Sequence, residues 1–270
     1  MCETCGCGQP GDFSVKAPHI RIFKDDGSAG AGSQYKPDLR DLVPDVGQGN
    51  EKLISVQKDI LSQNNLLARK NSNSFESRNI LCLNLVSSPG SGKTSLLEKT
   101  IRELKSERPL FVIEGDQQSS IDADRIKNAG APVVQINTNS GCHLDARMIQ
   151  KAQETFEIAN DSILFIENVG NLVCPALFDL GEHKRVLIMS VTEGEDKPLK
   201  YPAMFQSAHL CIINKTDLLP YLDFDMETAI RNIRNVNPSL ELLMISVKTG
   251  EGIQAWFDWC RVLRTRSESR

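Results

Sequence analysis

The sequence predicts a doubly wound α/β domain with a mostly parallel sheet, from three observations. Short apolar runs recur along the chain, helical patterns separate most of them, and a glycine-rich loop follows the first run. The runs are mainly apolar rather than alternating, which is typical of parallel strands covered on both faces. We expect strands at 80–87, 110–115, 133–137, 162–168, 185–191, 210–215 and 240–246. We expect helices at 92–106, 121–129, 145–158, 225–236 and 252–264.

The remaining chain divides into three regions before an α/β domain at 78–270. Residues 1–8 are a candidate metal-binding peptide, with three cysteines. Residues 9–47 are rich in Gly, Ser, Asp and Pro and predict a flexible linker. Residues 48–77 predict an amphipathic helix that docks on the body or on a partner subunit. Its apolar residues at helix-like spacing are Leu53, Ile54, Ile60, Leu61, Leu66 and Leu67.

Composition excludes several functions. The net charge is −4 and no long basic block is present, so neither nucleic acid nor an anionic membrane is indicated as a partner. No apolar stretch reaches the roughly 18 residues of a membrane span, and the N-terminus does not resemble a signal peptide. We therefore expect a cytoplasmic protein whose thiols stay reduced. The cysteines beyond the terminus are scattered, so Cys2, Cys5 and Cys7 are expected to be free thiols available to a metal.

The stretch SSPGSGKTS, from Ser87 to Ser95, predicts a phosphate-binding loop. It meets the pattern G-x-x-x-x-G-K-[ST], except that Ser87 takes the first position. Backbone N–H groups at the start of the following helix would surround the β-phosphate, Lys93 would reach the β- and γ-phosphates, and the Thr94 hydroxyl would bind Mg²⁺. A chance glycine-rich turn is disfavoured by the strand before and the helix after. The expected nucleotide contacts here are Gly90, Ser91, Gly92, Lys93, Thr94 and Ser95.

The base is predicted to be guanine. Asn214-Lys215-Thr216-Asp217 follows the sixth predicted strand, and the Asp217 carboxylate could accept hydrogen bonds from guanine N1–H and its exocyclic amine. Adenine has no such pair of donors. Lys215 would cover one face of the base, and Asn214 would brace the loops. A second base-contacting loop is expected at Ser246, Val247 and Lys248. The predicted ligand is GTP.

The predicted switch lies in FIENVGNLVCP. Glu167 and Gly170 have the spacing of a D-x-x-G motif, with Glu in place of Asp. Glu167 would hold Mg²⁺ and the Gly170 amide would sense the γ-phosphate. Asp116, at a strand end, is a second candidate Mg²⁺ carboxylate. Asp122 is our candidate for orienting the attacking water, and its alternative role is to complement a helix dipole.

Three further side chains form a candidate transition-metal site. Cys142 and His143 are adjacent, and Cys174 lies four residues beyond Gly170. A single cysteine is more often a small buried hydrophobe, but two ligand types at one loop and the link to the switch favour metal binding. Three side chains under-coordinate a metal, which water or a symmetry-related subunit could remedy.

Several motifs together resemble the HypB family of hydrogenase-maturation GTPases, a nickel-inserting group in the SIMIBI class of P-loop GTPases. They are the N-terminal C-x-x-C-G-C, SSPGSGKT, EGDQQSSIDADRI, NSGCHLDA, ENVGNLVCP and NKTD. The resemblance covers residues 79–265 and the first seven residues. It implies a GTP-dependent homodimer that helps to deliver Ni²⁺ to the large subunit of NiFe hydrogenase, with a small zinc-binding partner, HypA.

The same resemblance implies two metal sites. Cys2, Cys5 and Cys7 match the family's nickel site, and Cys142, His143 and Cys174 match its GTPase-domain site for Ni²⁺ or Zn²⁺. Two departures are Ser87 and the lack of a His-rich stretch at 8–47, which argues against nickel storage. The alternatives are a GTPase for another nickel enzyme such as urease, a metal buffer with a vestigial nucleotide site, and a P-loop kinase.

Overall fold

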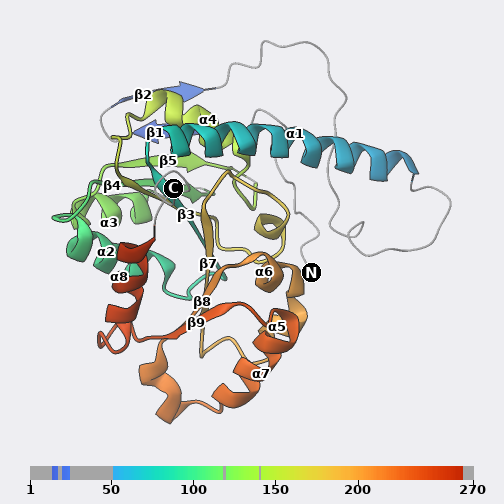
Figure 1. Ribbon diagram of the computed structural model, residues 1–270, viewed down its shortest axis with the longest axis vertical. Coiled ribbons are helices and arrows are strands. Elements are labelled where there is room, and N and C mark those ends of the chain that lie inside the picture. The colour runs from blue at the N-terminus through green and yellow to red at the C-terminus, as the bar shows by residue number, and fades with distance from the viewer. Residues whose placement is uncertain (1–13, 18–19, 25–50, 118–119, 140, 264–270) are drawn as a thin grey trace.

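The computed structural model describes residues 14–17, 20–24, 51–117, 120–139 and 141–263. Its strands form one nine-stranded sheet in the order β2-β1-β5-β4-β6-β3-β7-β8-β9 (Figure 1). The strands are β1 (Ser14–Ala17), β2 (Ile20–Lys24), β3 (Leu81–Ser87), β4 (Leu110–Asp116), β5 (Val133–Asn137), β6 (Ile163–Glu167), β7 (Lys184–Ser190), β8 (Leu210–Asn214) and β9 (Glu241–Met244). The pairings among β3 to β9 are all parallel.

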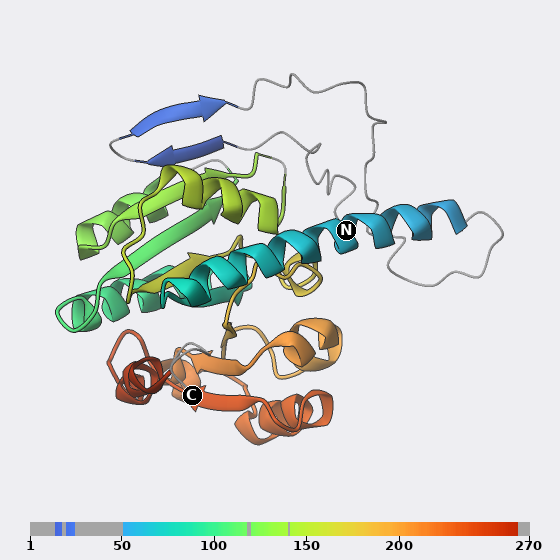
Figure 2. The ribbon, with the colours of Figure 1, turned by 45° about the horizontal axis from the view of Figure 1, so that its top comes forward.

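Helices cover both faces of this sheet, as Figure 2 shows. They are α1 (Glu51–Ser77), α2 (Lys93–Leu104), α3 (Ile121–Ala129), α4 (Ala146–Thr155), α5 (Lys197–Lys200), α6 (Pro202–Ser207), α7 (Met226–Val236) and α8 (Ile253–Val262), with short 3₁₀ turns η2 (Cys174–Ala176) and η3 (Thr216–Tyr221). The predicted doubly wound α/β fold is therefore confirmed. All seven predicted strands and five predicted helices are present, whereas α5, α6 and the 3₁₀ turns were not predicted.

The core follows from the two-residue repeat of the strands. On β3, Leu81, Leu83 and Leu85 pack with apolar residues of α2, α3 and α8 on one face of the sheet. Cys82 packs on the opposite face with Phe75 of α1 and residues of α4. Further along that second face, α6 and α7 cover a third apolar cluster. Because β3 to β9 are parallel, their carboxyl ends meet at one edge, where loops from distant parts of the chain can build a site.

Part of the range 9–47 departs from the predicted flexible linker. Ser14–Ala17 forms β1, which pairs antiparallel with both β2 and β5, and Ile20–Lys24 forms β2. The stretches SVKA and IRIFK contain β-branched residues, which favour strands, and β5 offers an edge to pair with. The rest of 9–47, and the peptide 1–8, lie outside the described residues.

The helix expected at 48–77 is α1, and one face of it packs on the body. Its fully or nearly buried residues recur as Asn64, Ala68, Asn71 and Phe75, whereas Leu66 is 60% exposed. Ile60, Leu61 and Leu67 are half-buried on the same side of α1, so the apolar spacing indicated the packed side except at Leu66. The first turns of α1 project beyond the α/β body in Figures 1 and 2. None of the helices described combines the length and the apolar character needed to cross a bilayer.

Candidate functional site

The phosphate-binding loop connects β3 to α2 and depends on its glycines. Gly90 and Gly92 have positive φ angles of 75° and 98°, which glycine adopts without strain. A Cβ at Gly92 would lie 2.4 Å from Nδ2 of Asn214, so the loop also needs the missing side chain. Among the residues described, no side chain caps the first turn of α2. Its N–H groups thus form an anion-binding end of the helix.

Ser87, which replaces the usual first glycine, fits this loop without strain. The described non-glycine residues with positive φ are Asn79, Asn139, Asp161 and Lys215, and Ser87 is not among them. Ser87 is buried, and its hydroxyl donates to the Ser88 carbonyl over 2.8 Å. The loop therefore accommodates a small polar residue at this position.

Glu167, at the end of β6, contacts the phosphate-binding loop directly. Its Oε1 lies 2.7 Å from Nζ of Lys93 and accepts from the Thr94 hydroxyl over 2.5 Å. Gly170 lies against the same loop, because a Cβ at this position would be 3.1 Å from a side-chain carbon of Pro89. The switch segment predicted from the sequence is thus packed against the residues predicted to hold the phosphates and Mg²⁺.

Glu114 is a candidate site residue that the sequence analysis missed. It lies opposite Glu167 where β4 pairs with β6, and shares a face of β4 with Asp116. Burial, followed by the nearby Glu167 and Asp116 carboxylates, raises the pKa of Glu114 to about 9. The Oε2 atoms of Glu114 and Glu167 are buried and have no hydrogen-bond partner among the described residues. Buried carboxylate oxygens of this kind suit a hard cation such as Mg²⁺.

Asp122 lies in the first turn of α3 and forms an ion pair with the Arg125 side chain. Arg125 contacts its Oδ1 over 3.0 Å, and the same guanidinium reaches Oε2 of Glu98 over 2.7 Å. Arg125 also donates to the Ser95 hydroxyl over 3.0 Å. Asp122 is therefore linked to the start of α2 through Arg125. This position fits the helix-dipole alternative as well as the predicted role with water.

Two loops at the carboxyl ends of β8 and β9 form the predicted base site. Oδ1 of Asp217 accepts from the Ser246 hydroxyl over 2.6 Å, which fixes the carboxylate. Oδ1 of Asn214 accepts from the Val247 amide over 3.1 Å, and its Nδ2 donates to the Ser91 carbonyl over 2.9 Å. Asn214 thus links the loops that follow β8 and β9 to the phosphate-binding loop.

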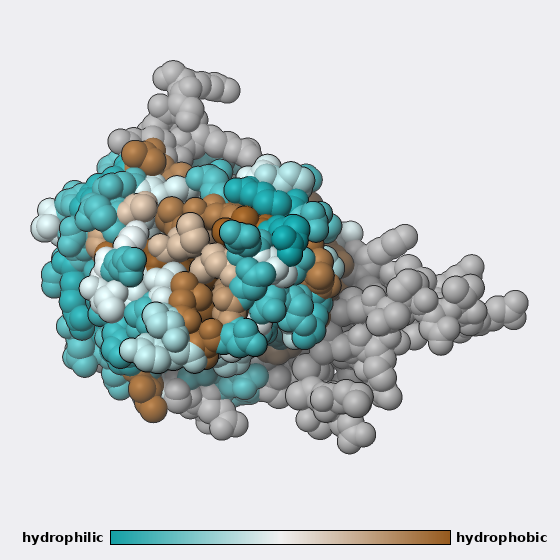
Figure 3. All heavy atoms as spheres, turned by 90° about the horizontal axis from the view of Figure 1, so that it is seen from below, coloured by the Kyte–Doolittle hydropathy of each residue, from teal (hydrophilic) through white to brown (hydrophobic). Residues whose placement is uncertain are grey.

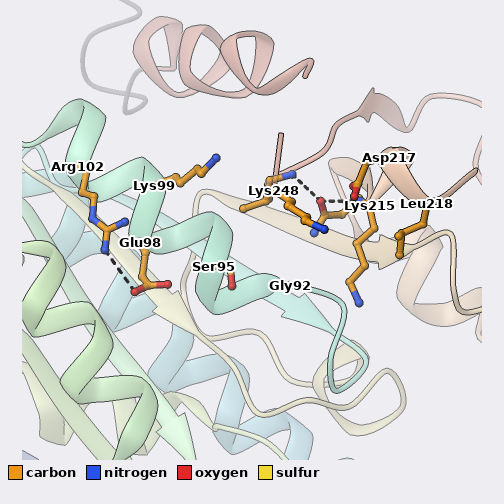
Figure 4. Close-up of a pocket in the computed structure, with 11 residues that line it drawn as sticks. Gly92, Ser95, Glu98, Lys99, Arg102, Lys215, Asp217, Leu218 and Lys248 are labelled. Atoms are coloured by element: carbon orange, nitrogen blue, oxygen red, sulfur yellow. Dashed lines mark hydrogen bonds and ion pairs between the residues drawn. The ribbon is translucent and has the colours of Figure 1, made fainter. Parts of the chain in front are cut away.

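A pocket of about 460 Å³ lies beside these loops. Figure 4 shows it between α2, which carries Ser95 and Lys99, and the loops with Lys215, Asp217 and Lys248. Lys215 has a left-handed backbone conformation, and its Nζ donates to the Gly90 carbonyl over 2.7 Å. The pocket therefore joins the phosphate-binding loop to the carboxylate expected to select the base.

Cys142, His143 and Cys174 come together from two loops. One ligand atom from each lies within 4.8 Å of the others, and the two Sγ atoms are 2.9 Å apart, too far for a disulfide bond. Both cysteines are buried, and the His143 ring lies 4.1 Å from the Phe178 ring. Two thiols and an imidazole are donors that suit zinc or nickel. Cys2, Cys5 and Cys7 lie outside the described residues.

The switch segment is bonded to the loop that carries Cys142 and His143. Oδ1 of Asn168, the residue after Glu167, accepts from the Leu144 amide over 3.3 Å. Nδ2 of Asn171 donates to the Cys142 carbonyl over 3.3 Å. One short segment therefore contacts the phosphate-binding loop at its start and the candidate metal site further along.

Comparisons with known proteins agree with this geometry. The family model described as "CobW/HypB/UreG, nucleotide-binding domain" matches residues 81–244. The chain is 45% identical to the hydrogenase maturation factor HypB of Escherichia coli K12, covering 98% of this chain and 99% of that one. Among solved structures, HypB of Archaeoglobus fulgidus has a TM-score of 0.69 at 38% identity, covering 74% of this chain and 98% of that one.

HypB of Helicobacter pylori, solved in complex with nickel, has the same TM-score of 0.69 at 33% identity. The match covers 74% of this chain and 94% of that one. The fold, the motifs and the overall sequence similarity all indicate the same family. The chain therefore belongs to the CobW/HypB/UreG family, among the HypB hydrogenase maturation factors.

Proposed function

We propose that this chain is a GTP-hydrolysing nickel metallochaperone that gates Ni²⁺ insertion into the large subunit of NiFe hydrogenase. The observation that carries the proposal is the switch segment from Glu167 to Cys174. It begins with a carboxylate bonded to Lys93 and Thr94 and ends with a thiol 2.9 Å from that of Cys142. A nucleotide-dependent movement of this segment would change the distance between metal ligands.

Lys93, Thr94, Glu167 and Asp116 would organise hydrolysis. Mg²⁺, when bound, supplies positive charge to the phosphate oxygens. The Thr94 hydroxyl and the Glu167 and Asp116 carboxylates would hold it, and Lys93 would stabilise the transferring phosphate. Lys93 and Thr94 now share Oε1 of Glu167, so nucleotide binding would redistribute these contacts. Asp122 would orient the attacking water once its hydrogen bond from Arg125 is broken.

Nickel is the cargo in this proposal rather than a resident cofactor. Soft thiolates and an imidazole at Cys142, His143 and Cys174 suit Ni²⁺ and also Zn²⁺. The three N-terminal thiols would form a separate nickel site. The relative from Helicobacter pylori that was crystallised with nickel supports this cargo.

The proposed partners are a second copy of the chain, a HypA-like zinc and nickel accessory protein, and the hydrogenase large subunit, all in the cytoplasm. A GTP-dependent homodimer would complete the coordination of a metal held by three side chains. Tyr221, Leu222 and Met244 are exposed apolar residues. Figure 3 shows apolar residues gathered on the face seen from below, at the end where Figure 1 places α7. Such a face favours protein association.

Cys174→Ser tests whether the switch cysteine is a metal ligand. We expect the variant to lose Ni²⁺ and Zn²⁺ binding at the GTPase-domain site and to retain Mg²⁺-dependent GTP hydrolysis, because the hydroxyl of serine is a poor ligand for these metals. Equilibrium dialysis and phosphate release measure the two properties. Cys260→Ser, a buried cysteine on α8, is the control. Unchanged metal binding would contradict the assignment, and an unmodified chain without GTPase activity would favour a metal buffer instead.

A further inference from the structure

We propose that α1 is a clamp for the Cys142–His143–Cys174 site, with Asn64 and Asn71 as positioning residues that hold its two ligand-bearing loops together. The inference rests on the proposed metal role of these three ligands. Cys142 and His143 lie between β5 and α4, whereas Cys174 lies between β6 and β7. The two loops are hydrogen-bonded to each other at Asn168 and Asn171, and α1 adds further bonds that join them. A metal requires the spacing of these loops to within a few tenths of an ångström, because its bond lengths are narrowly defined.

Asn64 bonds to both loops through a single side chain. Its Oδ1 accepts from the Ala146 amide over 2.9 Å, three residues after His143. Its Nδ2 donates to the Asp179 carbonyl over 2.8 Å, next to Phe178, whose ring lies 4.1 Å from that of His143. The amide group therefore bridges the first ligand loop to the second.

Asn71 repeats this bridge two helical turns further along, on the same face of α1. Its Nδ2 donates to the Ala146 carbonyl over 2.9 Å and to the Leu180 carbonyl over 3.0 Å. Its Oδ1 accepts from Nε2 of Gln153 on α4 over 3.2 Å. Both amide ends of Asn71 are thus occupied, and again one residue joins the two ligand loops.

The helix and the second loop also touch at Gly181. Its φ is +89°, and a Cβ there would lie 2.4 Å from the Ala68 carbonyl oxygen and 2.8 Å from Cβ of Asn71. No side chain separates the loop from the helix backbone. Any displacement of α1 would consequently be transmitted to residues 179–181 by direct contact.

The chemistry of the buried face of α1 supports positioning rather than packing alone. Asn64 is 6% exposed and Asn71 is 2% exposed. Burying a primary amide is costly unless it is hydrogen-bonded, so apolar residues would serve simple packing better. Directional bonds to both loops instead define one arrangement of the site.

The test uses the full chain with Cys2, Cys5 and Cys7 replaced by serine, so that only the GTPase-domain site binds metal. Asn64→Ala and Asn71→Ala are expected to weaken Ni²⁺ and Zn²⁺ binding by about 10- to 100-fold. This is the usual effect of mutating outer-shell residues that orient metal ligands. The thiolate–nickel charge-transfer absorption should change as well. GTP affinity should stay the same, since neither residue contacts the nucleotide loops.

Two further variants make the test specific. Asn64→Asp keeps the acceptor for the Ala146 amide and loses the donor to Asp179, so it should release only the second loop and still weaken metal binding. Asn232→Ala is the matched control, because Asn232 of α7 donates to the Glu195 carbonyl over 3.0 Å, away from the ligand loops.

Circular dichroism at the assay temperature verifies folding of each variant. Folded Asn64 and Asn71 variants with unchanged affinity and absorption, or an equal loss in Asn232→Ala, would overturn the clamp. If Asn64→Ala or Asn71→Ala is unfolded, the metal affinity of Asn64→Asp decides whether the clamp proposal holds. If the unsubstituted site in the same triple-serine chain binds neither metal, the proposed metal role itself fails, which is a separate outcome.

Discussion

Asp217→Asn is expected to weaken GTP binding by about 10²-fold or more and to shift preference toward xanthosine triphosphate. The Asp217 carboxylate accepts from Ser246 over 2.6 Å, so it is held in place to accept from a base as well. An amide would present a donor to the guanine exocyclic amine, whereas xanthine has a carbonyl there that can accept. Competition titration with a fluorescent guanine nucleotide measures both affinities.

The control for the base assignment is Asp223→Asn. Asp223 is an exposed aspartate close in sequence to Asp217, outside the pocket. Its substitution should leave both affinities unchanged. If Asp217→Asn bound GTP as tightly as the parent chain, the carboxylate would not read guanine, and a P-loop kinase with another nucleotide would have to be considered again.

Lys93→Ala is expected to reduce GTP hydrolysis by at least about 10²-fold, because a positioned charge on the transferring phosphate is lost. The Lys93 side chain is 12% exposed and lies 2.7 Å from the buried Glu167 carboxylate, so it is held at the phosphate-binding loop. Phosphate release under single-turnover conditions measures the chemical step. Nickel binding by the N-terminal peptide should be retained.

Lys127→Ala is the control for this second prediction, since Lys127 is exposed on α3. It should hydrolyse GTP at the parent rate. If Lys93→Ala also lost the N-terminal nickel, the terminus and the GTPase domain would not be separate modules, and the account of the chain as two modules would be wrong.

The α/β fold was predictable because buried parallel strands are continuous apolar runs, as the fully buried β3, β6 and β8 illustrate. The strands β1 and β2, at one end of the sheet, were not predicted, because they are short and the pairing of β1 with β5 depends on a strand edge distant in the sequence. The polar contacts on the packed side of α1 were missed for a related reason. Its face is built on Asn64 and Asn71, whose partners lie more than 70 positions away in the sequence.

The candidate site was predictable where a local pattern carries the chemistry. Gly92, Asn214 and Asp217 belong to short motifs, and the structure places them around one pocket. Glu114 carries no such signal, because it lies inside an apolar strand and acquires its raised pKa from burial and from Glu167, on another strand. The link from Arg125 of α3 to Ser95 and Glu98 of α2 likewise became evident only from the arrangement of the two helices.

The measurement that tests the central claim most directly is nickel binding as a function of the bound nucleotide. Ni²⁺ stoichiometry and affinity would be determined in reducing buffer for the intact chain and for a chain lacking residues 1–8. Each would be loaded with GDP or with a non-hydrolysable GTP analogue. We predict that truncation removes one nickel per chain and that the remaining site, at Cys142, His143 and Cys174, changes affinity with the nucleotide. Equal affinity in both nucleotide states would contradict a GTP-gated metal site.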